Sequence, residues 1–85
     1  MPDHHERASL YRLSVEITNR PERSMIVYVE PWGDEFEIRP VECIRVDILS
    51  PNFRAIPVSH GSNSITVEGW EGTTAEVWKG KDRLN

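Results

Sequence analysis

The residues best placed to do chemistry form an acidic cluster around one tryptophan. Four carboxylates lie within eight residues of one another, and an indole sits among them. Paired carboxylates can act as general acid and base when one of them is buried and its pKa is raised. We expect these carboxylates to lie on a turn and on the outer face of a strand, in contact with water, so we assign no catalytic residue. The cluster consists of Glu30, Trp32, Asp34, Glu35 and Glu37.

The charge imbalance of the whole chain belongs to the same segment. The 85 residues include 10 Lys and Arg against 14 Asp and Glu, a formal charge of −4. Residues 1–23 and 43–85 are each neutral, so residues 24–42 carry the entire excess. An anionic surface with an indole at its tip suits a basic protein partner. We therefore predict that the acidic cluster binds a protein of unknown identity.

An alternative explanation gives the acidic cluster no partner. Trp32 would fold back onto Tyr28 or Phe36, and the carboxylates would keep the hairpin edge from pairing with other chains.

The remaining reactive side chains do not form a site that we can recognise. Zinc and copper need several Cys, His or acidic ligands at suitable spacing, and Cys43 and His60 are isolated from each other. The sequence Ser59-His60-Gly61-Ser62 places hydroxyl groups beside an imidazole, but its Gly indicates a hairpin turn rather than a triad. No glycine-rich phosphate loop precedes a helix. We predict a protein that is not an enzyme and has no metal, no cofactor and no nucleic-acid partner.

Two further tryptophans offer a different kind of binding surface. Trp78 should face away from Val77, and Trp70 lies between two strands. If both rings point outward, they could stack on sugars or on a peptide, which makes carbohydrate or peptide binding the alternative function. In a core this small, the rings could instead cap the open end of the sheets.

Another alternative is a self-associating structural protein, in which an exposed edge at 53–58 pairs in a homodimer.

The elements that must position these residues are strands. Turn signals recur every eight to twelve residues, and the segments between them alternate apolar and polar side chains. The pattern predicts an all-β fold, a single antiparallel β-sandwich of about seven strands. The expected strands are 10–18, 25–30, 35–39, 43–49, 53–58, 64–70 and 74–79. The expected core is Leu13, Val15, Ile17, Val27, Val29, Ile44, Val46, Ile48, Ile65, Val67 and Val77.

Length and composition predict one small domain. We expect a flexible N-terminal tail at 1–8, the β-domain at 9–80 and a flexible C-terminus at 81–85. No apolar run reaches the roughly 20 residues that span a bilayer, and the polar start lacks the apolar centre of a signal peptide. A single cysteine allows no internal disulfide. These features favour a cytoplasmic protein without a membrane partner.

Part of the chain resembles a known family. An Asn19-Arg20-Pro21 turn, a strand at 26–30 that ends in an acidic glycine turn, and a Pro-containing turn at Arg39-Pro40 follow one another in order. This order is similar to the opening of the β-domain of the von Hippel–Lindau tumour-suppressor family and to that of small bacterial β-sandwich proteins. The resemblance covers residues 13–46 and implies a prealbumin-like sandwich, with the Asn19 side chain holding the first turn. The family's peptide-binding Ser, His and Trp have no counterpart at 43–48, so no binding residue is carried over.

Overall fold

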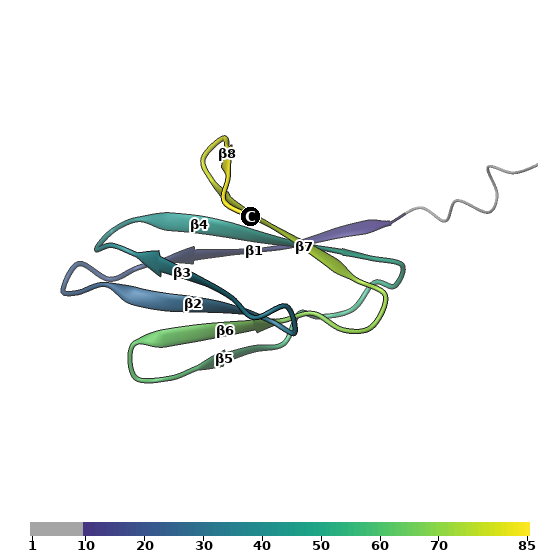
Figure 1. Ribbon diagram of the computed structural model, residues 1–85, viewed down its shortest axis with the longest axis horizontal. Coiled ribbons are helices and arrows are strands. Elements are labelled where there is room, and N and C mark those ends of the chain that lie inside the picture. Colours follow the sequence, from purple (N-terminus) through teal and green to yellow (C-terminus); the bar gives the residue numbers. More distant parts are fainter. Residues whose placement is uncertain (1–9) are drawn as a thin grey trace, which may run out of the picture.

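Two four-stranded sheets make up the protein in a computed structural model that describes residues 10–85 (Figure 1). One sheet has the order β1-β4-β7-β8 and is called sheet A here; the other has the order β3-β2-β6-β5 and is called sheet B. The described residues contain no helix, so none could cross a membrane. The strands are β1 (Tyr11–Thr18), β2 (Met25–Glu30), β3 (Asp34–Ile38), β4 (Cys43–Ser50), β5 (Val58–His60), β6 (Ser64–Glu68), β7 (Thr74–Lys79) and β8 (Asp82–Arg83).

The all-β prediction is confirmed, and five of the expected strands match closely. Four of them alternate apolar and polar residues, whereas β2 is a run of apolar, mostly β-branched and aromatic residues. Three details differ. The described residues form eight strands rather than seven, because Asp82–Arg83 in the expected flexible C-terminus pair with β7. The fold is not wholly antiparallel, because β6 runs parallel to β2. The tail expected at 1–8 lies outside the described residues.

The strand predicted at 53–58 is wrong. Residues 53–57 are irregular, and β5 begins only at Val58, the residue after Pro57. Proline has no backbone N–H and cannot donate a ladder hydrogen bond, so pairing with β6 starts after it.

Nine fully or almost fully buried apolar side chains from both sheets form one core cluster. Eight of them were predicted. The ninth, Ile38, was missed because the short β3 segment was considered only for its exposed glutamates and not for the apolar residues between them. Leu13, Val15 and Ile65 were predicted in the core but are only partly buried against it. The nine are Ile17, Val27, Val29, Ile38, Ile44, Val46, Ile48, Val67 and Val77.

The turn between β1 and β2 is held by the buried side chain of Asn19, as expected. Its Nδ2 donates to the carbonyl oxygens of Arg23 at 2.6 Å and Ile38 at 3.0 Å. Its Oδ1 accepts a hydrogen bond from the Arg20 amide at 2.8 Å. One amide side chain thus joins the β1–β2 turn to the end of β3.

Candidate functional site: the acidic face of sheet B

Strand alternation divides the predicted acidic cluster between two sides of sheet B. Glu35 and Glu37 are exposed on β3, while Asp34 is half-buried and points to the opposite side of the strand. Glu30 lies at the end of β2. The structure therefore brings together Glu30, Glu35 and Glu37 and separates Asp34 from them.

Trp32 does not project as a free tip. Its ring packs against the backbone of Gly69, where a Cβ atom would overlap it, and only 38% of the residue is exposed. The indole folds back, as the alternative explanation required, but onto Gly69 instead of Tyr28 or Phe36. Its role is to close the β2–β3 turn over the β6–β7 connection.

A fourth glutamate joins the cluster from a distant part of the chain. The parallel pairing of β2 with β6 places Glu30 beside Glu68. Sequence analysis missed Glu68 because charge was counted along the chain, and only the strand order reveals this neighbour. We call the outward side of sheet B formed by Glu30, Glu35, Glu37 and Glu68 the acidic face.

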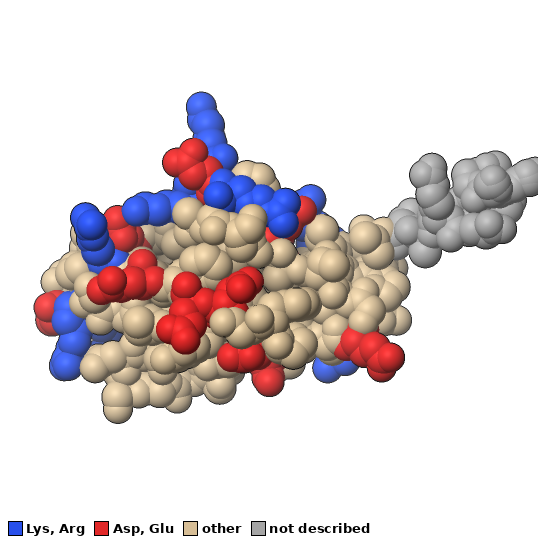
Figure 2. All heavy atoms as spheres, in the orientation of Figure 1, with Lys and Arg blue, Asp and Glu red and all other residues tan. Residues whose placement is uncertain are grey.

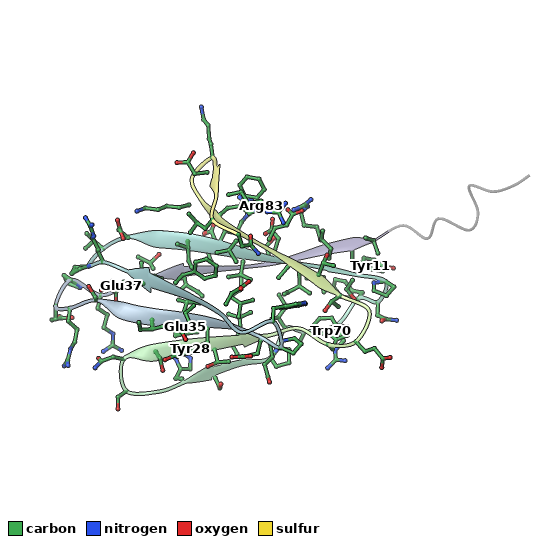
Figure 3. The ribbon with its side chains drawn as sticks, viewed as in Figure 1. Tyr11, Tyr28, Glu35, Glu37, Trp70 and Arg83 are labelled. Atoms are coloured by element: carbon green, nitrogen blue, oxygen red, sulfur yellow. The ribbon has the colours of Figure 1, made fainter. Side chains whose placement is uncertain are left out.

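Side chains of β2 and β6 lie beside these glutamates on the same face. Tyr28 lies directly between Glu35 of β3 and Thr66 of β6 in the strand register. In the next row, Ile26 lies between Glu37 and Ser64. Figure 2 shows acidic side chains gathered on the front of the molecule, and Figure 3 shows Tyr28 and Glu35 close together there.

The carboxylates of the acidic face are not neutralised by other parts of the described structure. Within residues 10–85, every ion pair involves Glu42, Asp47 or Glu76, and none involves the four glutamates of the acidic face. By contrast, Glu42 lies 2.6 Å from the Lys79 ammonium, which together with the Arg39 amide lowers the pKa of its carboxyl. Uncompensated like charges on one sheet face create a potential that attracts cations.

On the outer face of sheet A, in contrast to the acidic face, acidic side chains are paired with arginines. Asp47 of β4 is fully buried there beneath two half-exposed arginines. Arg12 donates to one of its oxygens at 2.8 Å, while Arg45 at 3.0 Å and Ser14 at 2.7 Å donate to the other. Burial alone would raise the pKa of Asp47, but these hydrogen bonds outweigh burial and hold the pKa below its ordinary value.

The same arginine extends this network to β7. Arg12 also lies 2.9 Å from Glu76, and Arg83 of β8 lies 3.8 Å from the other Glu76 oxygen. The hydrogen bond from Arg12 lowers the pKa of Glu76. The ion pairs of Arg12, Arg45 and Arg83 with Asp47 and Glu76 therefore connect β1, β4, β7 and β8 on this face.

The two other tryptophans have different surroundings. Trp70 packs against the core cluster with Arg54 stacked 4.3 Å from its ring centre, and its buried Nε1 has no hydrogen-bond partner in the described structure. Trp78 lies on the outer face of sheet A beside Arg45, and its Nε1 donates to Glu76 at 3.3 Å. Each tryptophan ring therefore lies against an arginine side chain; Trp70 also contacts the core cluster, and Trp78 also hydrogen-bonds Glu76.

The remaining reactive side chains, His60 and Cys43, lie in different parts of the structure. His60 is exposed and lines an open hollow of about 500 Å³ with residues of the β1–β2 turn, among them Arg20 and Arg23. Cys43 is exposed at the start of β4. No group of three or more His, Cys, Asp or Glu side chains in residues 10–85 could hold a metal ion.

Comparison with protein-family models, with curated proteins and with solved structures found no match for this chain. The acidic face must therefore be interpreted from its own geometry and charge.

Proposed function

We propose that the protein is a non-enzymatic interaction module that binds a basic, extended segment of a partner protein at the acidic face. The observation that carries this proposal is the set of four glutamates on one sheet face without an ion pair in residues 10–85. Three of the four belong to residues 24–42, the segment that carries the net charge of the chain. Complementary charge of this kind speeds encounter and selects the partner.

The edge of sheet B supports an extended partner in particular. In the described part of the chain, β3 is an edge strand that pairs only with β2. Gly33 donates to the Val29 carbonyl, and Gly69 donates to the Glu30 carbonyl, so odd-numbered residues of β2 turn their backbone groups toward β3. Their register partners Phe36 and Ile38 are then bonded to β2, which leaves the backbone groups of Glu35 and Glu37 on the free edge.

A peptide added to this edge would gain two kinds of contact at the same residues. Its backbone would pair with Glu35 and Glu37, and its outward Lys or Arg side chains would lie beside their carboxylates. Strand addition supplies affinity through main-chain hydrogen bonds, while the charges supply register. The partner class that fits is a β-strand with basic residues at alternate positions.

We also propose that the two sheets pack face to face as a β-sandwich of the prealbumin-like type. The support is the single core cluster, to which both sheets contribute fully buried side chains.

The direct test is a titration of the protein with a synthetic decapeptide of alternating Lys and Thr. Binding is monitored by the NMR chemical shifts of the protein's backbone amides. We expect the largest shifts at Glu35, Glu37 and their neighbours in β2, and weaker binding as salt is raised. A matched peptide of alternating Glu and Thr is the control and should not bind. Shifts confined to sheet A, or equal binding of both peptides, would overturn the proposal.

A further inference from the structure

In the part of the chain that the structure describes, β1 is a long edge strand whose outward row of backbone groups has no partner strand. Within residues 10–85 it pairs only with β4, over its full length from Tyr11 to Thr18. The Asn19 amide donates to the Glu42 carbonyl, and Asn19 continues the same register. Odd-numbered residues of β1 therefore turn their N–H and C=O groups toward β4, and even-numbered residues turn theirs outward. The outward residues are Arg12, Ser14, Glu16 and Thr18.

The other three sheet edges carry features that discourage pairing with another chain. β8 has two residues, and β5 has three and follows Pro57. β3 carries Glu35 and Glu37, which would repel the same strand of a second copy. β1 has eight residues and contains no Pro or Lys, two residues that commonly protect an edge, and its two charged residues, Arg12 and Glu16, are of opposite sign.

The charges on this edge are complementary to themselves. Arg12 and Glu16 lie at equal distances on either side of Ser14. We propose that β1 pairs antiparallel with β1 of a second copy, with Ser14 opposite Ser14, so that sheet A becomes continuous across a twofold axis. Arg12 of each copy then lies opposite Glu16 of the other.

This register is preferred over its neighbours. Moving either copy by two residues places Arg12 opposite Ser14 or Thr18 and removes both cross-copy charge pairs. Arg12 keeps donors for the new contact, because its hydrogen bonds to Asp47 and Glu76 use only Nη1 and a guanidinium has further N–H groups. Glu16 is exposed and has no ion pair within residues 10–85.

Apolar side chains on the inner side of β1 are incompletely buried in a single copy. Leu13 and Val15 have the spacing of core residues but are only partly buried, and Tyr11 is 49% exposed. In the proposed register, Leu13 of one copy lies opposite Val15 of the other, and Tyr11 lies opposite Ile17. The pairing adds about six backbone hydrogen bonds and covers these apolar side chains.

Amide hydrogen exchange tests this proposal without any substitution. In one copy the amides of Arg12, Ser14 and Glu16 have no backbone partner among residues 10–85, whereas those of Leu13 and Val15 are bonded to β4. We expect the first three to become protected as protein concentration rises through the dimer transition seen by sedimentation. A protein that stays monomeric at millimolar concentration, or a dimer in which these three amides still exchange freely, would overturn the proposal.

A charge reversal tests the register. Glu16→Arg places two arginines opposite each other at both ends of the interface and should raise the dimer dissociation constant about tenfold or more. The control is Glu22→Arg, which makes the same charge change at an exposed turn residue without an ion pair in the described structure, and it should leave the constant unchanged. Equal effects of the two variants would refute the Arg12–Glu16 pairing. Both readouts concern the edge of sheet A, so they can fail while the acidic face of sheet B still binds its peptide.

Discussion

Replacing Asp47 with asparagine should destabilise the fold while preserving its shape. The carboxylate is fully buried and accepts hydrogen bonds from Ser14, Arg12 and Arg45. Hydrogen bonds to a charged group contribute about 1.5–3 kcal/mol each. In Asp47→Asn the amide oxygen can still accept from Ser14 and Arg45, but the amide nitrogen faces the Arg12 guanidinium, so one charged hydrogen bond is lost and another is weakened.

The loss is limited because the arginines left behind can be hydrated. The side chains of Arg12 and Arg45 are 53% and 41% exposed, so neither becomes a buried unpaired charge. We therefore expect a decrease of about 2–3 kcal/mol in the free energy of unfolding. For a chain of this size, whose total stability is roughly 4–13 kcal/mol, that corresponds to a fall in Tm of roughly 10–20 °C.

The effect should depend on pH in a defined direction. The pKa of Asp47 is lowered in the folded protein, so near and below pH 4 the unfolded chain binds more protons than the folded one. The stabilisation from the charged carboxylate is complete above about pH 5 and is lost as the pH falls through the lowered pKa. The stability difference between wild type and Asp47→Asn should therefore be constant from pH 5 to 8 and should shrink toward pH 3.

Urea denaturation followed by circular dichroism at a series of pH values measures this difference. Asp82→Asn is the control, because Asp82 is exposed on β8 and has no ion pair within residues 10–85. An Asp47→Asn protein as stable as wild type at pH 7, or a difference that persists unchanged at pH 3, would refute the reasoning.

Two backbone positions give further predictions. Val41 has a φ of 60° and is exposed, a conformation that costs a β-branched residue energy, so Val41→Gly should stabilise the fold by roughly 0.5–1 kcal/mol in the same denaturation assay. An unchanged or lower stability would show that the strain is absent. Gly69→Ala places a methyl group against the Trp32 ring and the Thr73 hydroxyl, so it should destabilise the fold by about 1–3 kcal/mol and shift tryptophan fluorescence. Wild-type stability and fluorescence would contradict the packing of Trp32 on Gly69.

Local patterns predicted most of the strands but not their arrangement. Alternation in β1, β4 and β7 is a property of neighbouring residues, so it was visible in the sequence and placed Val46, Ile48 and Val77 correctly in the core. The parallel contact between β2 and β6 joins segments 38 residues apart in register, and no local signal specifies it. For that reason Glu68 was absent from the predicted site.

The burial of Asp47 could not be predicted from the sequence pattern either. Asp47 alternates with Val46 and Ile48, and this pattern places its side chain on the face opposite to theirs. It does lie on the outer face of sheet A, but the arginines of neighbouring strands cover it completely. A sequence pattern gives the side of the sheet on which a residue lies, while its burial depends on side chains that only strand pairing brings together.

Trp32 shows the same limit within the predicted site. Its place in an acidic turn suggested an exposed contact residue, and its neighbours in sequence suggested Tyr28 or Phe36 as packing partners. The residue that receives it is Gly69, where the missing side chain leaves room for the ring.

The most direct test of the central claim compares the affinity of matched charge variants for the alternating Lys-Thr peptide. Glu35→Gln/Glu37→Gln removes two charges from the acidic face, and Glu22→Gln/Glu71→Gln removes two from exposed turns elsewhere. Calorimetric titration at low salt should show the first variant binding about 2- to 30-fold more weakly than wild type and the second binding like wild type. Equal loss in both variants, or no loss in the first, would contradict an acidic face that recognises a basic strand.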